Sequence, residues 1–323
     1  MGSGVLELRD LRPTGSYLLL VDASSFIHRN YHALPKLTRQ RDGLETGALY
    51  GFTNTMLKLF WLNWSAINRL PTHGAVILDH RGKNWRHDIY PLYKEQRKPY
   101  EPQLLEQLPL IPSIAEAFNV PAIGVAGYEA DDVIATYVQM GEDAGLDVVV
   151  ASSDKDLMQL VRCEDGPWTI MYDGMKDKGR DDCAGALIGP HEVFDKLGVM
   201  PDRVADFLAL TGDAVDNVPG VPGVGPKTAA RVLADMGSLN DVLDAAAWET
   251  GRFKTVREAA AIDANSREVR MSRQLVDLDY SVPVPLDVDS LEIRQPDAFA
   301  LRGLMIEMEF NSLVERVDRP ARR

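Results

Sequence analysis

Residues 127–156 read GYEADDVIATYVQMGEDAGLDVVVASSDKD, a helical pattern that leads into a strand. Apolar residues recur at helical spacing over 133–144, and the short apolar run 146–150 is typical of a buried parallel strand. Three acids begin the predicted helix, and two more directly follow the predicted strand. Because open α/β sheets bind ligands beyond the carboxyl ends of their strands, we expect these five carboxylates at one edge of a sheet.

The same alternation of strand and helix recurs along the first part of the chain. Apolar runs that end in an acid occur at 17–22 and 75–79, and a helix is predicted between them at 47–67. Further elements are expected as strands at 120–125 and 168–172 and as a helix at 103–118. This pattern predicts an α/β fold with a mostly parallel central sheet and helices on both faces.

From about residue 188 the pattern becomes helical, with few strand candidates. Helices are predicted at 191–197, 202–210, 227–236, 239–247 and 257–275, and the apolar spacing between 299 and 308 predicts a closing helix. We therefore expect an N-terminal tail at 1–16, an α/β core at 17–187 and a helical domain at 188–323.

The composition is that of a globular protein: 323 residues, 45% of them hydrophobic and 26% charged. The formal charge of -13 does not exclude a polyanionic partner, because a site that holds metal ions must itself be acidic. Cys163 and Cys183 provide no disulfide framework and no zinc-ligand spacing, which favours a reducing cytoplasm. No apolar stretch reaches the roughly 18 residues that a membrane span needs, and the N-terminus lacks the pattern of a signal peptide.

Carboxylates are the strongest signal in the sequence. If the turn after residue 211 folds back onto the sheet edge, nine acids converge: Asp22, Asp79, Glu129, Asp131, Asp132, Asp154, Asp156, Asp213 and Asp216. Taken singly, a strand-terminal Asp is more often a helix cap, and acids in a first helical turn usually only stabilise the helix. Together they predict a site for two Mg²⁺ or Mn²⁺ ions that serves phosphoryl displacement by water.

Two basic stretches interrupt this acidic chain. Residues 28–41 read HRNYHALPKLTRQR and residues 81–98 read RGKNWRHDIYPLYKEQRK. An isolated charge run is usually a solvated helix face. Here each stretch follows a strand that ends in a candidate metal ligand, and cations interleaved with aromatic residues suit phosphate contact and base stacking. The stretches indicate a nucleic-acid strand with single-stranded character as the partner.

A glycine-rich turn, NVPGVPGVGPKT at 217–228, opens a predicted helix. Backbone N–H groups at a helix N-terminus can bind phosphate, and Lys227 adds positive charge. The turn is not a Walker loop, because that motif needs glycines where Val221 and Pro226 stand. The alternative interpretation is a Gly/Pro-rich turn between two helices.

Five motifs of this sequence occur together in one known family. They are VDASSFIHRNYHAL at 21–34, RHDIYPLYKEQR at 86–97, GYEADDVIA at 127–135, SDKDLMQL at 153–160 and TGDAVDNVPGVPGVGPKTA at 211–229. With them the chain, from about Tyr17 to Val317, resembles the bacterial and phage 5'-nuclease (flap endonuclease) family, which includes the 5'-3' exonuclease domain of bacterial DNA polymerase I. The resemblance implies a PIN-like core, a helical arch at about 80–105 and a helix-three-turn-helix motif at about 218–237 that holds duplex DNA.

The resemblance also implies roles for individual residues. One metal cluster would comprise Asp22, Asp79, Glu129, Asp131 and Asp132, and the second Asp154, Asp156, Asp213 and Asp216. Lys94 and Arg97 match arch residues that contact the scissile phosphate, and Arg29 matches a basic residue after the first strand. Tyr31 is a candidate for base stacking, and Arg86 and Lys98 for contacts with the strand. Gly223, Gly225 and Lys227 match a hairpin that grips a duplex phosphate and commonly holds K⁺ through backbone carbonyls.

The function that we expect is that of a structure-specific 5' nuclease, with 5'-flap endonuclease and 5'-3' exonuclease activity, in DNA replication and repair. A related metal-dependent ribonuclease is disfavoured because those proteins lack the turn at 218–229. A catalytically inactive scaffold for branched DNA is the other alternative, and the complete set of acids speaks against it. The expected partners are DNA with a 5' flap, nick or single-stranded 5' end, and a DNA polymerase; a cytoplasmic monomer is the default. The choice between a stand-alone nuclease and a polymerase domain stays open, and the polar insertion at 177–183 has no assigned role.

Overall fold

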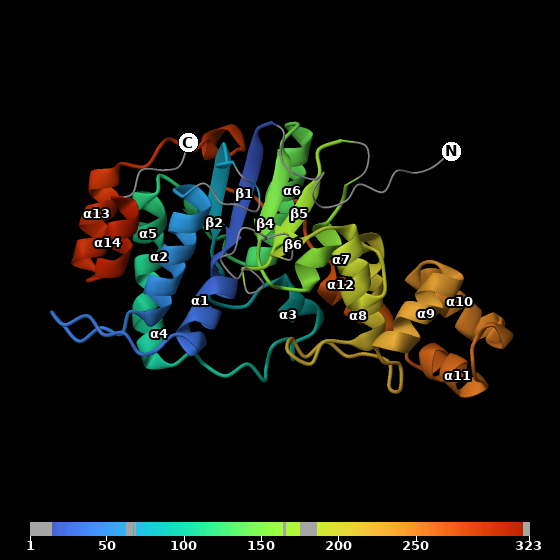
Figure 1. Cartoon of the computed structure of the whole chain (residues 1–323). Helices are drawn as coiled ribbons and strands as arrows, with labels where there is room; N and C mark the ends of the chain where they lie inside the picture. The colour runs from blue at the N-terminus through green and yellow to red at the C-terminus, as the bar shows by residue number, and fades with distance from the viewer. Residues whose placement is uncertain (1–14, 63–66, 68, 164–165, 175–185, 319–323) are drawn as a thin grey trace.

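The structure, a computed structural model, describes residues 15–62, 67, 69–163, 166–174 and 186–318, so the insertion at 177–183 and most of the N-terminal tail lie outside it. At its centre is a six-stranded sheet in the order β3-β2-β1-β4-β5-β6 (Figure 1). The strands are β1 (Tyr17–Asp22), β2 (His73–Ile77), β3 (Ala122–Ile123), β4 (Asp147–Ala151), β5 (Thr169–Tyr172) and β6 (Leu187–Ile188). All neighbouring strands are parallel except β6, which is antiparallel to β5. The predicted mostly parallel sheet is confirmed; β6 was not predicted.

Strand register brings the acidic strand ends together. Asp22 of β1 pairs with Ile77 of β2, two residues before Asp79, and Val21 pairs with Ala151 of β4, three residues before Asp154. All six residues of β1 are buried, as expected for a strand covered on both faces. The carboxyl ends of three neighbouring strands therefore deliver their acids to one edge of the sheet.

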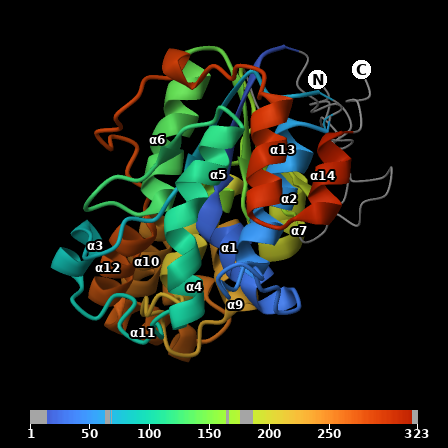
Figure 2. The same cartoon turned by 90° about the vertical axis from the view of Figure 1, so that its left-hand side faces the viewer.

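One face of the sheet is covered by helices from both ends of the chain (Figures 1 and 2). They are α1 (Ala23–Ala33), α2 (Gly47–Phe60), α4 (Pro102–Gln107), α5 (Ile111–Ala117), α13 (Ala298–Glu307) and α14 (Asn311–Val317). Buried side chains of α2 and α13 share a hydrophobic core with Leu19 and Val21 of β1. The two C-terminal helices, grouped by sequence with the helical region, thus pack beside the sheet core.

The opposite face is covered by α6 (Ala130–Asp143), and from there one hydrophobic core continues into the helical region. That region comprises α7 (Pro190–Leu197), α8 (Val204–Thr211), α9 (Pro226–Met236), α10 (Leu239–Trp248), α11 (Val256–Ala264) and α12 (Ser266–Val276). The single helix predicted at 257–275 is instead two helices that meet at Asn265. The boundaries of the three predicted parts stay a prediction, because the buried core runs on from the sheet into these helices.

The segment predicted as a helical arch contains little regular helix. Its helical residues are those of α3 (Trp85–Ile89) and the start of α4, with turns and extended chain between them. Among the described residues, short 3₁₀ helices occur at η2 (Leu108–Leu110), η3 (Asp156–Leu160), η5 (Pro201–Arg203), η6 (Thr250–Arg252) and η7 (Asp289–Leu291). Within the described ranges, no helix is both long and apolar enough to cross a membrane.

Candidate active site

Two adjoining cavities lie at the carboxyl edge of the sheet and together form the crevice. Their volumes are about 460 and about 650 Å³, and both are lined by Ser24, His28, Asp79, Arg97 and Tyr100. Seven of the nine predicted acids line them: Asp22, Asp79, Glu129, Asp154, Asp156, Asp213 and Asp216. Acids from five separate parts of the sequence therefore face one common space.

Asp22 is both a helix cap and a crevice residue. Its Oδ1 accepts hydrogen bonds from the Ser24 hydroxyl at 2.7 Å and the Ser25 N–H at 3.2 Å, at the N-terminus of α1. Its Oδ2 accepts from the Ser152 hydroxyl at 2.7 Å. Burial raises the pKa of Asp22 to about 6, and the charge of Asp79 adds to this rise. The cap interpretation and the crevice interpretation thus both hold for this residue.

Asp131, a member of the first predicted metal cluster, is influenced by the charges of acids from both clusters. Burial raises its pKa well above the ordinary value, and the negative charges of Asp154, Asp22 and Glu129 raise it further. The pKa of Asp131 therefore depends on the charges of acids in both clusters. In the described part of the chain, no three Asp, Glu, His or Cys side chains are arranged to hold a metal ion as they stand.

Asp156 has an unsatisfied oxygen. Burial raises its pKa to about 8, with further contributions from the charges of Asp154 and Asp213. Its buried Oδ1 receives no hydrogen bond from any described residue. Asp154 is exposed to solvent in the crevice, although protein surrounds it on most sides. Its Oδ1 accepts a hydrogen bond from the Asp156 N–H at 3.0 Å. A cation bound by these carboxylate oxygens would give Asp156 a partner and reduce the repulsion among the three negative charges. The residues therefore fit a hard divalent ion.

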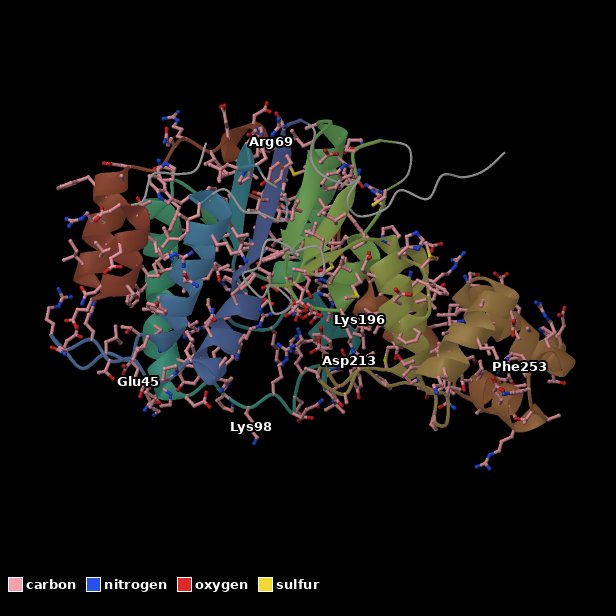
Figure 3. All side chains as sticks on the ribbon, in the orientation of Figure 1. Glu45, Arg69, Lys98, Lys196, Asp213 and Phe253 are labelled. Carbon is pink, nitrogen blue, oxygen red and sulfur yellow. The ribbon has the colours of Figure 1, made fainter. Side chains whose placement is uncertain are left out.

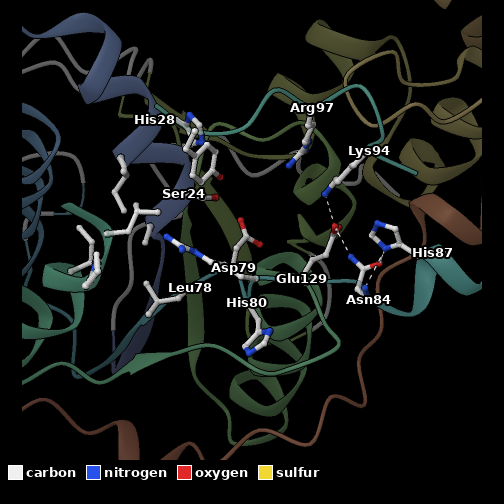
Figure 4. Close-up of a pocket in the computed structure, with 18 residues that line it drawn as sticks. Ser24, His28, Leu78, Asp79, His80, Asn84, His87, Lys94, Arg97 and Glu129 are labelled. Carbon is white, nitrogen blue, oxygen red and sulfur yellow. Dashed lines mark hydrogen bonds and ion pairs between the residues drawn. The ribbon is translucent and has the colours of Figure 1, made fainter. Parts of the chain in front are cut away.

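Two other crevice acids, Glu129 and Asp216, are paired with cations of the chain itself. Lys94 Nζ lies 2.5 Å from Glu129 and 3.4 Å from Asp216, and Figure 4 shows Lys94 and Arg97 reaching into the crevice. Arg97 contacts Asp216 at 2.5 Å. Burial alone would raise the pKa of Asp216, but these two cations outweigh it and lower that pKa. Two predicted phosphate contacts and two predicted metal ligands are therefore brought together.

Lys155 and Lys196, which the sequence motifs did not indicate, also line the crevice. Lys155, between the two acids of the D-K-D motif, lies 3.0 Å from Asp213. Lys196 of α7 lines the same cavity, where α7 approaches Asp213 (Figure 3). The position of Lys155 between two predicted metal ligands could have indicated that it faces the crevice. Nothing in the sequence near Lys196 could have done so, because only the tertiary fold brings α7 to the crevice.

Asp132 and Arg86 are buried beside each other and do not line the crevice. Arg86 is buried, and its guanidinium binds both oxygens of Asp132, with Nη1–Oδ2 at 2.7 Å and Nη2–Oδ1 at 2.8 Å. Asp132 also accepts from the Asp279 N–H at 3.0 Å. Arg86 was predicted to contact the DNA strand, but its side chain is only 2% exposed and so has little surface for such a contact. The geometry gives Asp132 a structural partner instead of a place in the crevice.

The remaining predicted contacts are divided between the crevice and its surroundings. Lys98 lines the crevice. Arg29 points behind it, where its Nη2 donates to the Ser153 hydroxyl at 2.7 Å and lies 3.9 Å from Asp173. Tyr31 lines a separate hollow of about 250 Å³ with His32. Two rings line both cavities of the crevice: His28 and Tyr100 lie edge to face, with centroids 4.5 Å apart.

The glycine-rich turn joins α8 to α9 and packs tightly on the end of α8. Asp213 and Val218 exchange backbone hydrogen bonds of 2.9 and 2.8 Å. Gly220 approaches Thr211 so closely that a Cβ atom would lie 2.3 Å from the Thr211 carbonyl oxygen, so a side chain cannot be placed there. Gly223 adopts a positive φ of 83°, and Lys227 is exposed in the first turn of α9. The loop therefore presents Gly223, Gly225 and Lys227 to solvent on one rigid connection.

Comparison with known sequences finds two adjacent family profiles. Residues 17–198 match the 5'-3' exonuclease, N-terminal resolvase-like domain, and residues 199–299 match the 5'-3' exonuclease, C-terminal SAM fold. A 5'-3' exonuclease of Aquifex aeolicus is 35% identical over 94% of this chain and 95% of its own length. A DNA polymerase I of Rhizobium leguminosarum is 45% identical over 94% of this chain, which spans only 28% of that polymerase.

Solved structures share the fold at low sequence identity. The T5 D15 protein, co-crystallised with metal ions, has a TM-score of 0.64 and 18% identity, over 94% of this chain and all of that one. The catalytic core of Rad2 in complex with DNA substrate has a TM-score of 0.61 and 16% identity, over 98% and 95% of the two chains. At this identity the likeness concerns the arrangement of sheet and helices.

Proposed function

The chain belongs to the 5'-3' exonuclease family, and from this premise we propose that it hydrolyses phosphodiester bonds near the 5' end of flapped or nicked DNA. The observation that carries the proposal is the crevice, where seven acids meet the arch cations Lys94 and Arg97. Membership of a nuclease family, together with the retained acids, disfavours the inactive scaffold. The T5 D15 protein binds metal ions and Rad2 binds DNA, which supports the same ligands here.

Two Mg²⁺ or Mn²⁺ ions are the cofactors that we propose. Asp22, Asp79, Glu129, Asp131 and Asp154 would hold them, with Asp156, Asp213 and Asp216 nearby. The unsatisfied Oδ1 of Asp156 and the raised pKa of Asp131 support a need for positive charge here. Bound ions would supply activation of the attacking water and stabilisation of charge on the phosphate. Asp132 would support this site from behind, through its ion pair with Arg86.

Lys94 and Arg97 would bind the scissile phosphate. Both side chains are held in the crevice by carboxylates, so an incoming phosphate could replace a carboxylate as their anionic partner. Positive groups aimed at the phosphate would stabilise the charge that develops during the displacement. Arg29 would act from further back, because it is oriented by Ser153 and Asp173.

The base beside the cleaved bond would stack on the His28–Tyr100 pair. Both rings line the crevice next to Asp79, whereas Tyr31 lies in a separate hollow. Stacking on aromatic rings accepts any base, which suits an enzyme that acts on structure and not on sequence. Lys98, at the crevice rim, would contact the same strand.

The duplex beyond the cleavage point would bind the glycine-rich turn. Exposed Gly223 and Gly225 allow close approach of a phosphate, and Lys227 adds charge at the start of α9. We propose K⁺ as an ion held by backbone carbonyls of this loop. A cytoplasmic monomer acting beside a DNA polymerase completes the proposal, which draws on the relationship to the polymerase of Rhizobium leguminosarum.

A 5'-flap substrate incubated with Mg²⁺ or with EDTA tests the proposal. We expect cleavage that requires Mg²⁺ and that Asp154→Asn abolishes, with a 5'-phosphate on the product. Cleavage that ignores both the chelator and the substitution would exclude the mechanism. Tight binding of the flap without cleavage by the wild-type protein would instead favour a scaffold.

A further inference from the structure

Two neutral side chains attach the arch segment Leu92–Arg97 to the acidic turn Asp213–Asn217. The Gln96 side-chain amide donates to the Ala214 carbonyl at 2.5 Å, and the Asn217 side-chain amide donates to the Leu92 carbonyl at 2.7 Å. Between them, the Lys94 N–H donates to the Asp216 carbonyl at 3.0 Å. Three hydrogen bonds therefore join two segments that lie about 120 positions apart in the sequence.

Each of the two joined segments contains one residue with an unusual backbone conformation. Lys94 has a φ of 58° and Asn217 a φ of 57°, a left-handed conformation that non-glycine residues rarely adopt. Such a conformation persists only where the surroundings support it. At Lys94 the conformation directs the side chain toward Glu129, and at Asn217 it presents the amide to Leu92. The attachment thus determines where the arch cations point.

We infer that Gln96 and Asn217 are positioning residues that hold Lys94 and Arg97 over the reacting phosphate. This inference rests on the proposed function of the two cations. The ion pairs of Lys94 and Arg97 with Glu129 and Asp216 must change when a phosphate or a metal ion enters the crevice. Hydrogen bonds from neutral amides to backbone carbonyls do not depend on those charges. They can therefore keep the arch segment in place while its ionic partners are exchanged.

Two neutral substitutions test this role. Gln96→Ala removes an exposed amide, and Asn217→Gly removes the other amide while it permits the left-handed backbone. We expect each to lower the single-turnover rate of 5'-flap cleavage about 10-fold, because a small misplacement of a catalytic group costs rate. Flap affinity measured in EDTA and the thermal midpoint should stay close to wild type. Gln295→Ala, which removes an exposed glutamine at the opposite edge of the sheet, is the matched control.

A double-mutant comparison separates positioning from a general structural effect. In a Lys94→Met, Arg97→Met background, neither Gln96→Ala nor Asn217→Gly should lower the rate further, because no cations are left to position. The inference would be overturned if Gln96→Ala and Asn217→Gly alone cleaved at the wild-type rate. It would also be overturned if they lowered the cleavage rate as much in the double-Met background as in the wild-type protein. If the wild-type protein itself cleaves no flap with Mg²⁺, the proposed function fails, which is a separate result.

Discussion

Arg86 and Asp132 form a buried bidentate ion pair, and their side chains are 2% and 0% exposed. Arg86 also donates to the carbonyl oxygens of Leu275 and Asp277, each at 2.8 Å. The pair thereby joins α3, α6 and the C-terminal end of α12. A residue from the basic stretch at 81–98 thus holds the base of the arch against the sheet and the helical region.

Replacing Arg86 should affect stability far more than DNA contact. Arg86→Met leaves the buried Asp132 carboxylate without its partner, which should cost about 3–5 kcal/mol of unfolding free energy. Urea unfolding measures this loss. Arg81→Met, at an exposed cation of the same segment, should stay within about 0.5 kcal/mol of wild type. A stable Arg86→Met protein with weakened flap binding would contradict the buried role and restore the contact predicted from sequence.

The metal-free protein should lose stability as the pH rises. The folded pKa values of Asp22 and Asp156 are raised to about 6 and about 8, above the ordinary 3.8. The stability that these two groups contribute is fully present below about pH 4 and is lost as the pH rises through the folded values. In EDTA, we expect the thermal midpoint to fall between pH 5 and pH 8 by roughly 2–5 °C.

Asp156→Asn should remove part of that loss. The variant carries no charge at this position, so its thermal midpoint in EDTA should fall less between pH 5 and pH 8 than that of wild type. Mg²⁺ should raise the wild-type midpoint more at pH 8 than at pH 5, because deprotonated carboxylates bind the ion. Parallel pH profiles for the two proteins would show that Asp156 is not under electrostatic stress.

The crevice cations should act on cleavage, and the crevice aromatics on binding of the flap. Lys94→Met should lower the single-turnover rate about 10²–10³-fold.

His28→Ala should weaken flap binding about 10-fold through lost stacking. Tyr31→Ala is the comparison, because the ring of Tyr31 lies in a different hollow. It should change flap affinity by less than about twofold. A larger effect of Tyr31 than of His28 would favour the stacking role predicted from sequence.

Lys227 should contribute one phosphate contact to duplex binding. Lys227→Ala should reduce the slope of log affinity against log salt concentration by about 1, with a similar effect on every duplex sequence. Fluorescence anisotropy with a nicked duplex at several KCl concentrations measures the slope. Arg294→Ala, an exposed cation beside η7 and away from the turn, should leave it unchanged. Equal slopes for all three proteins would remove Lys227 from the DNA interface.

Much of the fold followed from local pattern. The parallel strands and strand-end acids were readable because a buried strand is a short apolar run and the carboxyl ends of parallel strands share one edge. The two-residue strand β6 was missed because it is too short to show a pattern. The break at Asn265 was missed because the apolar spacing continues through 257–275.

Spacing along the chain was enough to predict an α/β sheet with acids at one edge and basic stretches beside it. Which charges face the crevice depends on how distant segments pack together. Arg86 and Asp132 neutralise each other in the interior, whereas Lys94 and Arg97 reach Glu129 and Asp216. The reason is physical: the partner of a buried charge is selected by desolvation and by contacts between residues 35 to 119 positions apart, which no local pattern records.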